Sequence, residues 1–174
     1  GISGIVTAFD ADTGRQLWQR PADRVEPLYH TGQSPFVDGD LMIVHVGGDS
    51  AGALTAFDVA TGDVKWSWDG DGPAYGSPMV VELEGVRQVV TFTQENLVGV
   101  SAETGQLLWS RPYTTPSTTT SQTPNIYQND VIEAGRGNGI TRFRVVREGN
   151  AWATENVWHT DEVSSHMSNG VVVD

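Results

Sequence analysis

The sequence predicts an all-β protein, a β-propeller built from four-stranded antiparallel blades. Three observations predict this fold: a recurring Thr-Gly-x-x-x-Trp motif, a Ser-Pro or Thr-Pro pair that recurs in phase with it, and strand-like runs separated by Gly and Asp clusters. Both markers keep a period of about 45 residues. Four short strands in about 40 to 50 residues are typical of one propeller blade, whereas helical repeats would show a 3.6-residue apolar period.

The Thr-Gly-x-x-x-Trp motif aligns without gaps over residues 8–18, 56–66 and 99–109. We expect its glycine to take the positive-φ position that closes a hairpin, and Asp10 and Asp58 to accept turn amides with their side chains. A tryptophan at a fixed place in each repeat is explained by packing between neighbouring blades, with its indole N–H bonded to a carbonyl. The residues assigned to this docking motif are Gly14, Trp18, Gly62, Trp66, Gly105, Trp109 and, in a weaker fourth copy that lacks Thr-Gly, Trp158.

The Ser-Pro or Thr-Pro pair marks where each blade begins. Ser34-Pro35, Ser77-Pro78 and Thr123-Pro124 each precede a short apolar run, and 168–173 look like a fourth start without the proline. The whole chain, 1–174, is therefore predicted as one propeller segment of about four blades. Its parts are a partial blade over 1–20, complete blades over about 33–68, 76–111 and 122–158, and a partial blade over 168–174. In the first complete blade we expect strands over about 34–38, 41–47, 52–58 and 63–68.

Composition narrows the possible functions. Lys and Arg together number 10 against 22 for Asp and Glu, which gives a formal net charge of -12. Binding a phosphate backbone requires clustered basic residues, so we expect no nucleic-acid partner. No run reaches the roughly 18 apolar residues of a membrane span, so we expect no membrane insertion by this segment. The absence of cysteine excludes disulfides, zinc-thiolate sites and cysteine nucleophiles.

The pattern Ala-x-Asp-x-x-Thr-Gly-x-x-x-Trp resembles the tryptophan-docking motif of the PQQ-like (pyrroloquinoline quinone) β-propeller repeat family, in particular the bacterial PQQ-binding-like and BamB-type repeat proteins. The resemblance covers nearly the whole chain and implies a ring of seven or eight blades, of which this chain supplies about half. The remaining blades would come from a longer chain or from a second copy that closes the ring. The resemblance also implies a periplasmic or extracellular location, and no signal peptide is recognisable at the first residues.

The family includes scaffold proteins, quinoprotein alcohol dehydrogenases and sensor domains, so three functions stay open. The first is a non-catalytic binding or scaffold module of an exported bacterial protein. The second is a fragment of a PQQ-dependent alcohol or sugar dehydrogenase, for which the resemblance implies PQQ with Ca²⁺ as cofactors. The third is a ligand-sensing propeller domain. No cofactor site and no catalytic residue is identifiable, because the family's catalytic Asp motif maps to no position and a cysteine pair is absent.

No metal site is predicted either. The segments 10–12 and 69–72 carry Asp and Gly at close spacing but do not continue as a calcium loop, and we interpret them as turns. The four histidines have no paired short spacing, and His45, within an apolar strand, is interpreted as a packed or edge residue.

Position within the repeat gives the remaining candidates. In a propeller, the connections from an outer strand to the next inner strand gather on one face around the central channel. Here they precede each Ser-Pro or Thr-Pro marker. We therefore expect a protein or small-molecule partner on the channel face, with ordinary channel-lining residues as the alternative. The candidate ligand-binding residues are His30, Gln33, Tyr75, Gln122 and His166.

Overall fold

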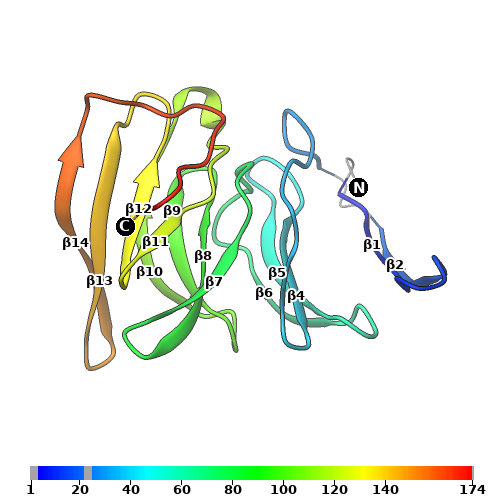
Figure 1. The fold of residues 1–174 in the computed structure, drawn as a ribbon. Coiled ribbons are helices and arrows are strands. Elements are labelled where there is room, and N and C mark those ends of the chain that lie inside the picture. The colour runs from blue at the N-terminus through cyan, green and yellow to red at the C-terminus, as the bar shows by residue number, and fades with distance from the viewer. Residues whose placement is uncertain (1–3, 22–24, 174) are drawn as a thin grey trace.

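The structure is a computed structural model that describes residues 4–21 and 25–173. Residues 1–3 of the first predicted partial blade and residue 174 of the last lie outside the described residues. Within them, fourteen strands form four antiparallel sheets, and the one helical element is a 3₁₀ turn at Pro116–Thr118. Figure 1 shows the sheets standing side by side in chain order. The predicted all-β fold of four-stranded antiparallel blades is confirmed.

Each sheet pairs its strands in the order in which the chain makes them. The first sheet has two strands, β1 (Val6–Phe9) and β2 (Gln16–Arg20). The second has β3 (Phe36–Asp38), β4 (Leu41–Val46), β5 (Ala53–Asp58) and β6 (Val64–Trp68). The third has β7 (Met79–Leu83), β8 (Val86–Phe92), β9 (Asn96–Ser101) and β10 (Leu107–Pro112). The fourth has β11 (Asn125–Tyr127), β12 (Asp130–Ala134), β13 (Ile140–Glu148) and β14 (Ala151–Thr160).

The end of the chain differs from the sequence prediction. We expected residues 168–174 to begin another blade with a first strand, but the described residues 168–173 form no strand. A strand needs a neighbour to accept and donate its backbone hydrogen bonds, and no described strand pairs with this segment. It is held against the fourth sheet by other bonds, such as the 2.9 Å bond from Gln122 Nε2 to the Ser168 carbonyl.

The apolar core lies between the sheets. Ile43 and Leu54 of the second sheet pack with Val89 and Val98 of the third, and all four side chains are fully buried. A larger cluster joins the third sheet to the fourth around Phe92 and Phe143, and a smaller one joins the second sheet to the first. The middle strands of the second and third sheets are buried on both faces because each of these sheets lies between two neighbours, which explains their continuous apolar runs.

Tryptophans connect the sheets at their outer strands. The indole N–H of Trp18 donates to the Val59 carbonyl of the next sheet at 2.8 Å, and that of Trp66 donates to the Ala102 carbonyl at 2.9 Å. Trp18 and Trp66 also cover Gly62 and Gly105 of the next sheet so closely that a Cβ there would meet the ring. The motif glycines have φ of 69°, 73° and 75°, as predicted. Asp10 and Asp58 accept turn amides through Oδ1, also as predicted.

The third tryptophan behaves differently. Trp109 donates to Oε1 of Gln88 in its own sheet at 2.7 Å, rather than to a carbonyl of the next sheet. Its ring stands edge-on to Phe143 of the fourth sheet, with centroids 5.8 Å apart. The turn of the fourth sheet, 147–150, has no Thr-Gly pair to accept the ring. Trp158 of that sheet is 42% exposed.

Two glycine substitutions separate packing from backbone strain. Gly14 and Gly62 both have positive φ, but only Gly62 has a neighbour, the Trp18 ring 2.6 Å from a built Cβ. We expect Gly14→Ala to lower the free energy of unfolding by about 1–2 kcal/mol, the left-handed backbone cost. Gly62→Ala should lose at least about 1 kcal/mol more, because the ring must move. Urea unfolding measures both. Equal losses would show that the tryptophan does not rest on the glycine.

Candidate functional site

The connections between sheets lie at one edge of the fold, the top in Figure 1. We name this edge, formed by residues 25–35, 69–78, 112–124 and 161–170, the loop face. The connections gather at this edge because four antiparallel strands return the chain to the edge from which it started. The five residues predicted to bind a ligand lie on these connections. They are His30 and Gln33 before β3, Tyr75 before β7, Gln122 before β11, and His166 after β14.

A repeated hydrogen bond runs across the loop face through the Ser-Pro and Thr-Pro markers. The Ser34 backbone N–H donates to Oγ of Ser77 at 2.9 Å, and the Ser77 N–H donates to Oγ1 of Thr123 at 3.2 Å. The Thr123 N–H then donates to Oδ1 of Asn169 at 2.9 Å. We call these three bonds the marker chain. A hydroxyl before the proline is needed because it accepts the N–H of the preceding sheet.

The two candidate glutamines precede the markers and make equivalent bonds. Gln33 Nε2 donates to the Ala74 carbonyl at 2.7 Å, and Gln122 Nε2 donates to the Ser168 carbonyl at 2.9 Å. Gly76 occupies the same place between them, where a side chain would collide with the Gln122 carbonyl. Both amides therefore join neighbouring connections, and Gln122 is 3% exposed.

The other three candidates each make a different contact on the loop face. The Tyr75 hydroxyl accepts the Tyr29 backbone N–H at 3.1 Å, and burial raises the pKa of Tyr75. His30 is exposed, with Nδ1 2.9 Å from a Glu26 carboxylate oxygen. His166 is exposed, and its carbonyl accepts the Ser121 hydroxyl at 2.8 Å.

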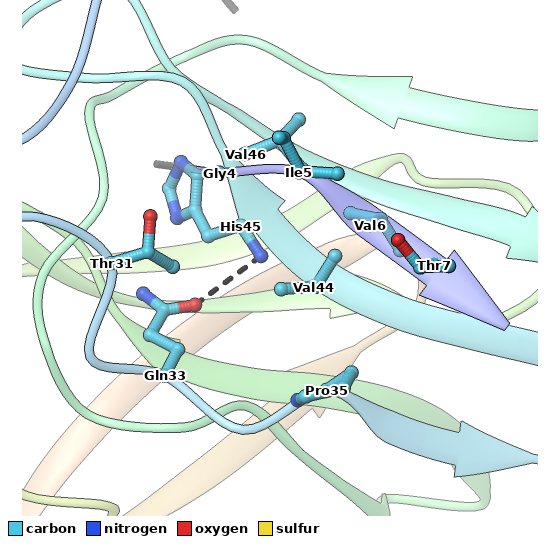
Figure 2. A pocket seen from close by; sticks show the side chains of 10 residues that line it. All are labelled: Gly4, Ile5, Val6, Thr7, Thr31, Gln33, Pro35, Val44, His45 and Val46. Carbon is cyan, nitrogen blue, oxygen red and sulfur yellow. Dashed lines mark hydrogen bonds between the residues drawn. The ribbon is translucent and has the colours of Figure 1, made fainter. Parts of the chain in front are cut away.

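Gln33 lines a cavity of about 280 Å³ between β1 and β4. Figure 2 shows Gln33, Thr31 and His45 on one side of it and Val6 and Thr7 of β1 on the other. The His45 backbone N–H donates to Gln33 Oε1 at 3.3 Å, the dashed line in the figure. The cavity thus has one polar wall, made by the loop face and β4, and one mainly apolar wall, made by β1.

His45 also lines this cavity; the sequence indicated a packed or edge residue within an apolar strand, and it was not among the ligand-binding candidates. Its ring is buried, and Nε2 lies 3.0 Å from the Asp71 carbonyl, which can only accept a hydrogen bond. The proton is therefore on Nε2, and Nδ1 has no partner among the described residues. Burial lowers the pKa of His45 to about 4, so the ring is neutral at neutral pH. In the other two complete sheets, the strand register puts Phe92 and Ala134 at the position of His45. A histidine where the other repeats have an apolar residue was the sequence signal that could have pointed to this site.

A PQQ and Ca²⁺ site does not fit the loop face. Ca²⁺ takes six to eight oxygen ligands, typically carboxylates and carbonyls, and the described residues hold no group of three or more acidic or histidine side chains placed for a metal ion. The amides of Gln33 and Gln122 are committed to carbonyls of neighbouring connections. We therefore derive no chemistry through that cofactor.

Comparison with known families matches residues 1–174 to the family described as "Outer membrane protein assembly factor BamB". The chain belongs to this family of PQQ-like β-propeller repeat proteins. Among curated proteins, the polyvinylalcohol dehydrogenase of Sphingopyxis sp. (strain 113P3) is 35% identical over 72 residues, which cover 34% of this chain and 11% of that protein.

Solved structures share the fold. BamB from Moraxella catarrhalis superposes with a TM-score of 0.64 at 17% identity, covering 93% of this chain and 47% of that one. The quinohemoprotein alcohol dehydrogenase of Comamonas testosteroni superposes with a TM-score of 0.54 at 16% identity, covering 88% of this chain and 32% of that one. The chain therefore spans less than half the length of either protein.

The buried His45 predicts a loss of stability in mild acid. In the unfolded chain its pKa returns to about 6.5, so between pH 6.5 and about 4 the unfolded state binds a proton that the folded state does not. This stability is complete above pH 6.5 and is lost as the pH falls toward 4, by roughly 3 kcal/mol. We expect His45→Phe, which copies Phe92, to remove that part of the pH dependence in urea unfolding at pH 7 and pH 4.

His30→Gln is the control, because His30 is exposed, and it should keep the pH dependence of the unchanged protein. Other titrating groups affect all three proteins alike, so the comparison isolates His45. A His45→Phe protein that loses as much stability in acid as the unchanged protein would contradict the assignment of a buried, neutral ring.

Proposed function

We propose that this chain is part of a β-propeller that serves as a binding or scaffold module of an exported bacterial protein, with a protein partner on the loop face. One observation carries the proposal: the connections there expose large apolar side chains. Leu28 and Tyr29 are 63% and 64% exposed before β3, and Met167 is 77% exposed after β14. The polar candidates Gln33 and Gln122 are instead used to hold the connections together.

The chemistry of these side chains favours a protein partner over a small molecule. Tyrosine and methionine are enriched in the centres of protein interfaces, where lysine and glutamate are depleted. Adaptable methionine is also common on surfaces that bind several sequences. The rigid marker chain beneath them fixes the backbone of the connections, so little ordering of the loop backbone is needed when a partner binds.

The proposal of export draws on the family. The matching family is described as an outer membrane protein assembly factor, a role that is carried out beyond the cytoplasmic membrane. Within the described part of the chain, no helix is long and apolar enough to cross a membrane.

A second candidate function is a PQQ-dependent dehydrogenase. The observation that favours it is the 35% identity to a polyvinylalcohol dehydrogenase over 72 residues. The loop face does not support a dehydrogenase, because the side-chain amides of Gln33 and Gln122 already donate to backbone carbonyls. In such an enzyme, this chain would contribute blades rather than the cofactor site.

Site-specific photo-crosslinking tests the binding face. A benzoylphenylalanine at position 29 or 167 of the protein, expressed in its bacterial host, should crosslink to a discrete protein partner. The same group at Gln106, in an exposed turn at the opposite edge of the third sheet, should not. The readout is the shifted band and its peptides. Equal crosslinking from both edges, or none from the loop face, would overturn the proposal.

A titration of the whole protein with PQQ and Ca²⁺ separates the two candidate functions, because in a dehydrogenase the cofactor site would lie outside the loop face described above. If the chain is a binding module, neither ligand alone nor both together should raise the melting temperature or quench tryptophan fluorescence saturably. Saturable quenching accompanied by a higher melting temperature would favour the dehydrogenase.

A further inference from the structure

A second cleft, of about 570 Å³, lies between the end of β10 and the fourth sheet. It is separate from the cavity at Gln33. Polar side chains from both sheets line it, among them Arg111, Tyr113, Glu133, His159 and Asp161. A volume of this size lies within the range of sites that bind small molecules, roughly 300–1,000 Å³.

Glu133 is the unusual residue of this cleft. Its side chain is 5% exposed, and Oε1 accepts a hydrogen bond from Arg111 Nε at 2.9 Å. Oε2 has no partner among the described residues. The strand register puts Val44 and Thr91 at the equivalent positions of the other two complete sheets. The fold therefore does not require an acidic side chain at the position of Glu133.

Tyr113 adds a second polar atom without a partner. It is 6% exposed, and its hydroxyl, which has the Asn138 side chain beside it, makes no hydrogen bond of normal length and angle with the described residues. Counted from the repeat tryptophan, Gly70 holds the equivalent position in the second sheet. A buried polar atom left unsatisfied costs about 1–3 kcal/mol. Of the three such side-chain atoms in the described chain, two belong to residues that line this one cleft.

The remaining groups give the cleft its charge. His159 bridges Thr141 Oγ1 and Asp161 Oδ1, with both contacts at 2.9 Å. With Thr141 donating to Nδ1 and Nε2–H donating to Asp161, a neutral ring satisfies both bonds. The carboxylates of Glu133 and Asp161 carry two negative charges and the Arg111 guanidinium carries one positive charge, so the cleft has a formal excess of one negative charge. Both acids also have a carboxylate oxygen that no described residue binds.

We propose that this cleft binds a small organic cation through an ammonium group, which donates to the carboxylates of Glu133 and Asp161 and to the Tyr113 hydroxyl. An ammonium group offers three donors and one positive charge, which match the free acceptors and the excess negative charge. A metal ion fits less well, because no group of three or more ligating side chains is placed for one among the described residues. The net charge of -12 also attracts cations to the protein.

The inference does not rest on a protein partner at the loop face, although Tyr113 and Asp161 belong to the connections that form that face. The groups that carry it belong to the junction of two blades, and none of them is a residue of the marker chain. A cation site here is compatible with either candidate function, and its failure would leave both untouched.

The test uses three probes of the same length and different charge: n-butylammonium, n-butanol and n-butyrate. Heteronuclear NMR of the protein follows the ring signals of Tyr113 and His159 during each titration. We expect n-butylammonium to shift both sets of signals saturably, and to do so more weakly as salt is raised. Equal binding of n-butanol or n-butyrate, or no saturable shift with n-butylammonium, would overturn the proposal.

Variants locate the site. Glu133→Gln and Asp161→Asn should each weaken n-butylammonium binding about tenfold, the loss expected for a charge-assisted hydrogen bond. Asp69→Asn is the matched control, because Asp69 holds the position equivalent to Asp161 in the second sheet and is also exposed. Should Glu133→Gln fail to fold, Asp161→Asn decides, since Asp161 lies at the surface. Unchanged affinity in Asp161→Asn would contradict the proposed contacts.

Discussion

The packing of one tryptophan on the glycine of the next sheet is the contact on which the arrangement depends. Four strands make a sheet, but a sheet with two apolar faces is stable only between neighbours. Trp18 on Gly62 and Trp66 on Gly105 hold the first sheet against the second and the second against the third. Only glycine satisfies both requirements there, because the turn needs positive φ and the ring occupies the space of a Cβ. The buried clusters between the sheets follow from this packing.

The marker chain does at the inner strands what the tryptophans do at the outer ones. The second and third sheets are thereby fixed to each other at two separate points, by Trp66 at the outer strand and by the Ser34–Ser77 bond before the inner strand. This has a consequence for function. The polar side chains that a channel would offer to a ligand are used for assembly, while apolar side chains such as Leu28 and Met167 stay exposed. An edge whose connections are held in place and that exposes apolar groups is suited to protein recognition.

The features that recur in every repeat could be predicted from the sequence, whereas the features that differ from the repeat could not. The strands of the second sheet, the positive-φ glycines and the carbonyl partners of Trp18 and Trp66 follow from features that recur, so one copy explains the others. Trp109 turns to Gln88 because the next turn lacks Thr-Gly, and this requires knowing which side chains lie within reach. His45 and Glu133 owe their character to burial, which no spacing reveals. The strand expected over 168–174 required a partner strand that the pattern alone does not supply.

Hydrogen exchange of single amides tests most directly whether the sheets are fixed at two points. The amides of Ser34, Ser77 and Thr123 lie outside the strands, and exposed loop amides ordinarily exchange quickly. If the marker chain holds the sheets, these three amides should exchange only through the same opening that exposes the central strands β8 and β9, with the same dependence on urea. If they exchange as fast as the amides of exposed turns while β8 and β9 stay protected, the inner connection does not hold the sheets together.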